Sequence, residues 1–244
     1  MNKSVSFPIQ AESQLPGGLL LIDKPSGFTS NDIVAIARRV LHTKCIGHSG
    51  TLDPMATGLL ILLVQRQATR LQNQFLKLDK IYQATLKLGI DTDTWDAAGA
   101  ITHTLPVPSL TLAQIQAAAQ TLTGAVTQQI PPFSAKKING QKMYDLARQG
   151  TPVQDRFNTV QIFSWDHFQF DGKDTLSFTL HASCGTYVRS LAHMLAQALG
   201  TTGHLTNLRR LSIGPFSVEH ALDGYKLKTI SHTEIVKFLQ EPVL

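Results

Sequence analysis

One stretch in the first quarter of the chain constrains its fold more than any other. It reads Gly47-His48-Ser49-Gly50-Thr51-Leu52-Asp53-Pro54-Met55-Ala56-Thr57-Gly58 and runs directly into six apolar residues, Leu59 to Val64. The twelve residues have neither a helical nor a strand period, and glycine permits the backbone conformations that tight loops need. Pro54 disfavours the helical conformation at Asp53. The stretch therefore predicts a shaped loop that leads into a buried strand.

Asp53, at the centre of this loop, allows two interpretations. A carboxylate held in a rigid loop beside a buried strand is a candidate catalytic group, since functional residues concentrate on loops. Gly, Pro, Asp and Ser are also the usual residues of a tight surface turn. Local chemistry alone favours the surface turn, so the rest of the chain has to decide.

The composition indicates a globular protein with a polyanionic partner. The 244 residues suffice for one or two domains with a substantial core, and 43% hydrophobic residues argue against wholesale disorder. Twenty-two Lys and Arg against 17 Asp and Glu give a formal net charge of +5. An excess of this sign favours partners such as nucleic acid.

Cysteine usage and the apolar runs predict a cytoplasmic protein that does not cross a membrane. Cys45 and Cys184 form no CxxC pair, and two thiols alone cannot build a structural zinc site. Free thiols suit a reducing compartment. The first fourteen residues lack an apolar signal core, and no run approaches the roughly 20 apolar residues of a membrane helix.

Hydrophobic periodicity predicts an irregular alternation of strands and helices. Two of the expected helices begin at Ser30 and at Ser109 or Thr111, the second with Leu112 facing inward. A third follows the stretch 184–189, with Leu191, Met194, Leu195 and Leu199 facing inward, and a last one begins at Ser231. Several neighbouring strands are joined too closely for parallel crossovers, so we expect an α+β fold on a mixed, largely antiparallel sheet. The expected strands are 17–22, 59–64, 82–88, 160–163, 176–182 and 205–211.

Common catalytic and binding motifs are absent from the sequence. No phosphate-binding loop or GxGxxG motif is present, and no second Asp-Thr/Ser-Gly loop completes an aspartic-protease dyad. The stretch 91–96 only faintly resembles a calcium loop, because it lacks the glycine and the glutamate that such a loop needs. No Ser-His-Asp arrangement can be assigned around Asp53. The carboxylate of Asp53 remains the one candidate catalytic acid.

Arg189 lies in an unusual setting, Gly185-Thr186-Tyr187-Val188-Arg189, at the expected start of a helix. A cation is disfavoured near a helix N-terminus, which makes a specific anionic partner attractive. An arginine paired with Asp53 would favour the charged carboxylate. The alternative is an ordinary surface arginine.

The stretch Pro131 to Gly150 mixes basic with aromatic residues around an Asn139-Gly140 turn. That mixture suits a segment that faces RNA. A solvated helix with a lysine-rich face explains it equally well on local grounds.

Taken together, these motifs resemble those of the TruB-type tRNA pseudouridine-55 synthases. The loop 47–58 is similar to the family's second motif, and further matches follow in order over roughly residues 17–216. They are Leu20 to Gly27, Lys80-Ile81-Tyr82, Gly89 to Asp96, Ile130 to Pro132 with Ser134 to Lys137, Tyr144 to Arg148, Gly185 to Arg189 and Leu208 to Leu211.

The resemblance implies roles for three residues in the chemistry. Asp53 is the expected nucleophile, and Arg189 is its ion-pair partner. Tyr187 would lie at the base of the pocket as a proton-transfer group.

Five further residues are expected to bind substrate or to support the site. Tyr82 would stack on the flipped uracil, and Leu208 would line the pocket. His48 would stack inside the RNA loop and help to hold the target uridine out. Lys24 and Asp96 would tie the active-site loops together or touch RNA.

The resemblance also implies a pseudouridine-synthase-like α+β fold, its sheet flanked by helices and loops. Residues 1–16 would be a polar lead-in and 17–216 the catalytic domain, with an RNA-gripping insertion at 131–156. Residues 217–244 would form a short C-terminal extension in place of a full PUA domain, with room for one helix and little else.

The implied activity is the isomerisation of uridine 55 in the T loop of tRNA to pseudouridine. The base leaves its stack, its bond to the sugar breaks at N1, and the bond re-forms through C5. No electron leaves the system, so we expect neither a redox cofactor nor a metal. We expect a cytoplasmic monomer that binds the T-arm of tRNA, without an obligate protein partner. The alternative is an RNA-binding, tRNA-folding chaperone whose catalysis is secondary or lost.

Overall fold

A computed structural model describes residues 15–131, 137–138, 141–142 and 156–242 of the chain. Most of the expected lead-in 1–16 and of the insertion 131–156 therefore lies outside the described residues. No helix within the described ranges is both long enough and apolar enough to cross a membrane.

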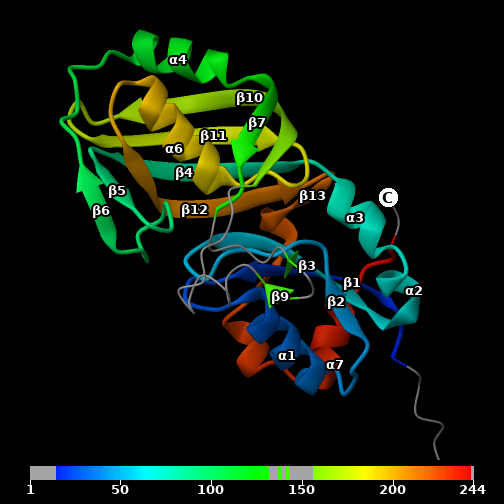
Figure 1. The fold of residues 1–244 in the computed structure, drawn as a ribbon. Coiled ribbons are helices and arrows are strands. Elements are labelled where there is room, and N and C mark those ends of the chain that lie inside the picture. Colours follow the sequence, from blue (N-terminus) through cyan, green and yellow to red (C-terminus); the bar gives the residue numbers. More distant parts are fainter. Residues whose placement is uncertain (1–14, 132–136, 139–140, 143–155, 243–244) are drawn as a thin grey trace, which may run out of the picture.

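One mixed sheet is built from strands that come from all parts of the described sequence (Figure 1). Its ten strands, as far as the chain is described, are β1 (Gly18–Lys24), β2 (Ile46–His48), β3 (Thr57–Val64), β4 (Lys80–Leu88), β7 (Gly124–Gln129), β10 (Phe157–Phe170), β11 (Thr175–Ala182), β12 (Gly203–Ile213), β13 (Phe216–Ser217) and β14 (Leu222–Asp223). The strand order is β14-β1-β3-β12-β4-β11-β10-β7, with β2 paired to β3 and β13 to β12. Two small separate sheets pair β5 (Ile90–Thr92) with β6 (Ile101–Thr104) and β8 (Lys137–Ile138) with β9 (Gln141–Lys142).

Among these pairings, β1 with β14 and β3 with β12 are parallel, whereas the other neighbours are antiparallel. The predicted mixed, largely antiparallel sheet is confirmed. The parallel contact between β3 and β12 lies at the middle of the sheet, where it joins the N-terminal strands to the rest.

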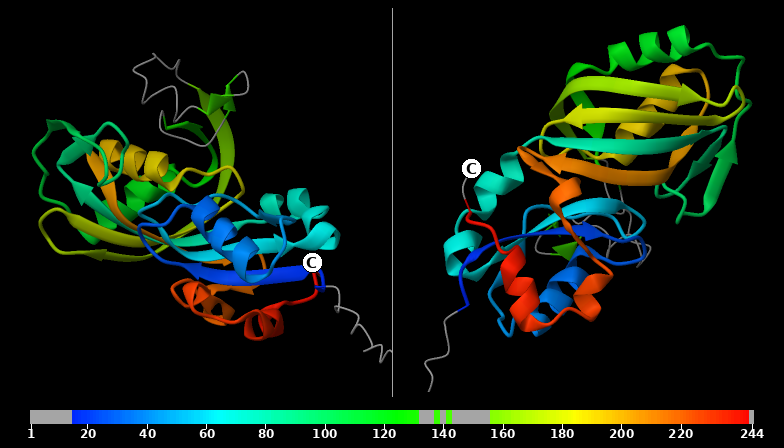
Figure 2. Two further views of the ribbon diagram at one scale, coloured as in Figure 1. Left: turned by 90° about the horizontal axis from the view of Figure 1, so that it is seen from below. Right: turned by 180° about the vertical axis from the view of Figure 1, so that it is seen from behind.

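Helices lie against both faces of the sheet (Figure 1). The helices of the described residues are α1 (Ser30–Val40), α2 (Gln65–Thr69), α3 (Gln72–Lys77), α4 (Leu112–Thr121), α6 (Val188–Ala198) and α7 (His232–Ile235), with 3-10 turns η1 (Val218–His220), η2 (Lys226–Lys228) and η3 (Val236–Phe238). The rear view in Figure 2 shows β10, β11, β4 and β12 on the near side, with α6 behind them and α4 along the top of the view. Near the other end of the sheet, α1 and α7 lie side by side against β1 and β3.

The N-terminal strands explain the most apolar run of the sequence. On one face of β3, Leu60 packs with Ile33 of α1, and on the other face Ile61 packs with Phe75 of α3. Every residue from Leu59 to Val64 is 0% exposed. A strand that is buried on both faces reads as a continuous apolar run instead of an alternating one.

Helix starts differ in detail from the sequence predictions. The N-cap of α1 is Thr29 and not Ser30, because the Thr29 hydroxyl accepts the Asp32 amide while the Asp32 carboxylate accepts the Thr29 amide. The Ser30 hydroxyl instead accepts the amide of Leu52, 2.9 Å away, and so ties α1 to the loop before Asp53. Leu112 is 48% exposed, so the prediction that it faces inward was wrong.

Residues 217–242 contribute more than the one helix that we expected. The predicted capping box of Ser231 and Glu234 is present at α7, but α7 has only four residues. Strand β14 pairs with β1, and Leu227 and Ile235 are 0% exposed in the same core as α1. This part of the chain is therefore built into the sheet and its core.

Candidate active site

A cavity of about 640 Å³ opens at the middle of the sheet, where β12 lies between β3 and β4. Its walls include five residues of the predicted site, Asp53, Tyr82, Tyr187, Arg189 and Leu208. They come from the loop before β3, from β4 and β12, and from the start of α6. A pocket of this volume suits a ligand of the size of a nucleoside.

Asp53 and Arg189 meet through two hydrogen bonds. Arg189 Nε donates to Asp53 Oδ2 at 2.9 Å, and Nη2 donates to Asp53 Oδ1 at 3.2 Å. The arginine side chain is 4% exposed, whereas the aspartate side chain is 33% exposed. A paired, planar contact of this kind fixes both groups. The carboxylate is thus held in place and still open to a substrate.

The guanidinium is held from its other side by the 92–99 loop. Arg189 Nη1 donates to the carbonyl of Thr94 at 2.8 Å and lies 3.7 Å from Asp96 Oδ2. The Asp96 carboxylate in turn accepts the Thr94 hydroxyl and the amide of Ala98. Asp96 is 6% exposed, so the structure places it behind the arginine, where it ties loops together. The anionic partners also offset the cost of a cation near a helix N-terminus.

The buried side chain of Arg210 supports the loop that carries Asp53. No role was predicted for this residue from the sequence. Its side chain donates to the carbonyls of Leu59 and Gly50, at 2.7 and 3.2 Å. Burial lowers the pKa of Arg210, while Tyr82 and Asp53 oppose that shift. The doublet Arg209-Arg210 in a strand pattern was the available signal, because an arginine on the buried face of a strand needs acceptors nearby.

Lys24 ties the loop to the turn after β1. Its ammonium donates to the carbonyls of Phe28, Pro25 and Pro54 at 2.7, 3.0 and 3.3 Å, and the residue is 0% exposed. Burial lowers the pKa of Lys24 to about 8, partly opposed by Asp53. A fully buried lysine in this place is a tie between loops and does not present its charge to RNA.

His48 lies beside the cavity and outside its lining. It is the last residue of β2, so the loop begins two residues later than the sequence predicted. Its Nδ1 accepts the amide of Gly50 at 3.3 Å, and burial together with Arg210 lowers its pKa. The imidazole is therefore half-buried and anchored to the start of the loop.

Tyr82, Leu208 and Tyr187 form the rest of the lining. Tyr82 and Leu208 are 7% and 4% exposed and stand on the neighbouring strands β4 and β12. Tyr187 is half-buried at the N-cap position of α6. Lys80, two residues before Tyr82, also lines the cavity and caps the end of α3 through the carbonyls of Leu76 and Leu78. Burial lowers the pKa of Lys80 to about 8.

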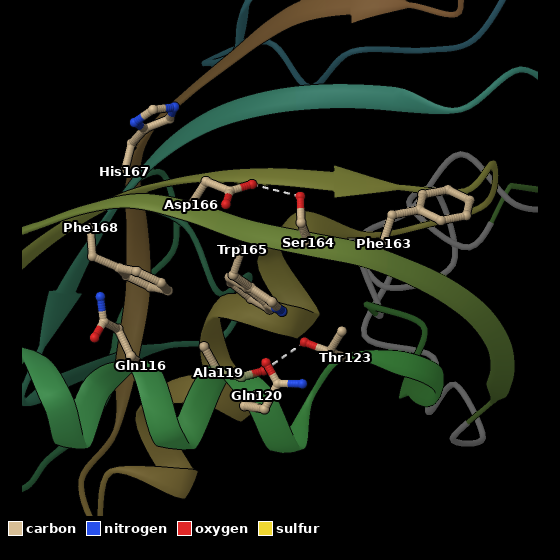
Figure 3. A pocket seen from close by; sticks show the side chains of 10 residues that line it. All are labelled: Gln116, Ala119, Gln120, Thr123, Phe163, Ser164, Trp165, Asp166, His167 and Phe168. Atoms are coloured by element: carbon tan, nitrogen blue, oxygen red, sulfur yellow. Dashed lines mark hydrogen bonds between the residues drawn. The ribbon is translucent and has the colours of Figure 1, made fainter.

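A second cavity, of about 500 Å³, lies between α4 and β10 (Figure 3), and it shares no lining residue with the first cavity. Two of its polar groups have hydrogen-bond partners: Ser164 donates to Asp166 at 2.6 Å, and Trp165 Nε1 donates to the carbonyl of Leu122. No buried ion pair faces it among the described residues, and no described cluster of three or more His, Cys, Asp or Glu side chains could hold a metal ion. The first cavity, which holds the pair of Asp53 and Arg189, is therefore the candidate active site.

The sequence matches those of known proteins over most of its length. Residues 38–188 match the model of the TruB family pseudouridylate synthase (N terminal domain). The tRNA pseudouridine synthase B of Opitutus terrae is 44% identical over 236 residues, which are 95% of each chain. That of Aromatoleum aromaticum is 46% identical over 86% of this chain and 68% of the relative.

Solved structures of lower identity share the fold. A chain in the crystal structure of a Cbf5-Nop10-Gar1 complex matches with a TM-score of 0.68 and 26% identity. A chain of the archaeal box H/ACA sRNP Nop10-Cbf5 complex matches with a TM-score of 0.67 and 25% identity. The present chain is matched over 92% and 97% of its length but spans 60% and 62% of those chains. The family model covers more than half of the chain and the relatives match most of it, so the chain belongs to the TruB family of pseudouridylate synthases.

Proposed function

We propose that this enzyme converts uridine 55 in the T loop of tRNA to pseudouridine. The observation that carries the proposal is the two-point pair of Asp53 and Arg189 in the wall of a 640 Å³ cavity that also holds Tyr82 and Leu208. The relatives named tRNA pseudouridine synthase B support tRNA as the substrate. The net charge of +5 favours the same kind of polyanion.

The reaction moves one bond and needs a well-placed carboxylate. The bond from C1′ of the ribose to N1 of uracil breaks, the base turns, and C1′ bonds to C5. N1 gains a proton, and C5 loses its hydrogen as a proton. Asp53 assists by attack on the sugar, by attack on the base or by removal of a sugar proton in an elimination, and each route uses the same carboxylate. Arg189 holds that carboxylate at the cavity surface.

The cavity is suited to a base that has left its stack. Extrusion of a nucleotide costs a few kcal/mol, which contact with an aromatic ring and apolar side chains offsets. Tyr82 and Leu208 supply that contact on neighbouring strands. Tyr187, at the start of α6, is the group that we assign to proton transfer. His48 would hold the RNA loop in its open form, next to the cavity rather than inside it.

The support of the site comes from groups that do not touch the base. Lys24 and Asp96 hold the loops around Asp53 and Arg189 through the contacts described above. We assign catalysis to residues 17–216 and the grip on the T-arm to the insertion 131–156. We expect the enzyme to work as a cytoplasmic monomer without an obligate protein partner or cofactor.

The assignment of the position is tested with two tRNA transcripts. One carries uridine 55, and the other carries cytidine at that position while every other uridine is kept. Pseudouridine is mapped after carbodiimide treatment by stops in primer extension. We expect one stop, at position 55, in the first transcript and none in the second. Modification of another uridine in either transcript would contradict the assignment to position 55.

A further inference from the structure

Gln128, near the end of β7, is a fully buried polar residue behind the cavity wall. Its side-chain carbonyl Oε1 accepts the backbone amide of Tyr187 at 3.0 Å, and its Nε2 donates to the backbone carbonyl of Gly185 at 2.9 Å. The residue is 0% exposed. One amide side chain thus takes the place of a peptide unit of a neighbouring strand and binds the segment at two points.

Asn158 completes this contact from the adjacent strand. It is the register partner of Gln128 on β10. Its Oδ1 accepts Gln128 Nε2 at 3.2 Å, and its Nδ2 donates to the same carbonyl of Gly185 at 3.2 Å. The two amides therefore hold each other and share one acceptor on the cavity wall.

Only a side chain with both a donor and an acceptor fits this place. The amide of Tyr187 can only donate and the carbonyl of Gly185 can only accept, so the orientation of the Gln128 amide is determined. Glutamate would keep the acceptor and lose the donor. A further hydrogen bond joins β7 to α6 three residues after Tyr187, where Ser190 Oγ donates to the carbonyl of Gln129 at 2.6 Å. The end of β7 thus grips the segment that begins α6.

We propose that Gln128, assisted by Asn158, is a positioning residue for catalysis. It sets the backbone at Tyr187, and Arg189 follows two residues later on the first turn of α6. Misplacement by about 1 Å can cost on the order of a hundredfold in rate. The proposal rests on the proposed function, because it assigns Tyr187 and Arg189 to the chemistry. The expected result of losing the contact is slower turnover at unchanged affinity for RNA.

The first test is the variant Gln128→Ala. Turnover is measured at saturating T-arm transcript by tritium release from 5-labelled uridine, and affinity is measured separately in an Asp53→Ala background. We expect kcat to fall at least about tenfold, with Kd within about twofold of its original value. Wild-type kcat in a folded Gln128→Ala protein, or a loss confined to Kd, would overturn the proposal.

A matched control lies one position along the same two strands. Thr127 and Thr159 are also register partners, and their hydroxyls lie 3.1 Å apart on the exposed side. Thr127→Ala removes a side-chain hydrogen bond between β7 and β10 without touching the segment at Gly185. We expect its kcat to be unchanged. A loss equal to that of Gln128→Ala would show that the effect is a general weakening of the strand pair and would also overturn the proposal.

The nearly isosteric variant Gln128→Glu keeps the test decisive if the alanine variant does not fold. A buried carboxylate would face the carbonyl of Gly185, whereas the protonated acid can donate to it. We therefore expect the ratio of variant to wild-type kcat, each expressed per folded enzyme from circular dichroism at the same pH, to rise as the pH falls. A ratio that stays constant with pH contradicts the proposal. Inactive wild-type enzyme in the same assay would instead refute the proposed function.

Discussion

The contact between Arg189 and Asp53 depends on the shape of the guanidinium as much as on its charge. Arg189→Lys keeps the charge but cannot make both hydrogen bonds or reach Thr94 at the same time. We expect kcat to fall by roughly a hundredfold, with little change in the Kd for RNA. The measurement is single-turnover kinetics together with a binding titration.

Arg209 supplies the control for this substitution. It forms an equally two-pronged pair with Asp23, at 2.9 and 2.6 Å, and neither residue lines the cavity. We expect Arg209→Lys to leave kcat close to wild type. If Arg189→Lys lost turnover and RNA affinity to the same extent, Arg189 would be an RNA contact and not the holder of the carboxylate.

The burial of Lys24 predicts how the free energy of unfolding depends on pH. Burial lowers its pKa from 10.5 to about 8, so between these values the unfolded chain binds more protons than the folded one. Its contribution to the free energy of unfolding therefore rises as the pH increases through that window. Relative to Lys24→Met, we expect the wild type to gain about 1 kcal/mol between about pH 7 and pH 9. Urea unfolding at each pH measures the difference, and a difference that does not change with pH would contradict the burial of a charged Lys24.

At the scale of the elements, the contact of β3 with β12 places the loop that carries Asp53. Gly58 has φ +101°, and a Cβ there would lie 2.6 Å from the Arg210 nitrogen and closer still to its carbonyl oxygen. We expect Gly58→Ala to destabilise the protein by roughly 3 kcal/mol or more, because the strands must separate. Gly172→Ala is the control, since Gly172 has φ +79° but nothing within 4 Å of its Cβ position. Its cost should be only about 1 kcal/mol, and equal costs in urea unfolding would refute the close approach.

Local periodicity predicted several elements well. The alternation from Tyr82 to Leu88 appears as β4, with Tyr82, Ala84, Leu86 and Leu88 on the buried face. The inward positions Leu191 and Leu195 of α6 are both 0% exposed. These elements could be predicted because each buries one face, and the period of its apolar residues reports that face directly.

The errors and omissions arise where long-range contacts decide. Thr29 and not Ser30 caps α1, because the Ser30 hydroxyl is engaged by Leu52, 22 residues away. Strand β2 takes His48 out of the predicted loop through pairing with Leu62 of β3. Arg210 and Gln128 were missed because their partners lie far away in the sequence. An isolated buried polar residue carries no local period, so only the assembled sheet reveals its contacts.

At the scale of the whole molecule, residues 217–242 belong to the same core as α1. Leu227 and Ile235 pack with Ile33 and Leu60, and Gln240 exchanges two backbone hydrogen bonds with Leu19 of β1, at 2.8 and 2.9 Å. A segment held in this way should unfold together with the sheet. It is therefore part of the cooperative unit that carries the site.

Leu227→Ala tests this integration. We expect a loss of about 2–5 kcal/mol in the free energy of unfolding, with one cooperative transition in urea. Tyr225→Ala, two residues away and 59% exposed, should cost much less and serves as the control. A separate early transition in Leu227→Ala, with the main transition unmoved, would mean that the segment is an independent appendage.

The central claim is that the Asp53 carboxylate carries the isomerisation, and tritium release tests it most directly. A T-arm transcript labelled at C5 of its uridines loses tritium to water only when C5 bonds to the sugar. We expect release with the wild-type enzyme and none above background with Asp53→Asn or Asp53→Ala, while both variants still bind the RNA. Asp53→Asn keeps the size of the side chain, so it separates the loss of the carboxylate from the loss of packing. Tritium release that survived in either variant would contradict the account.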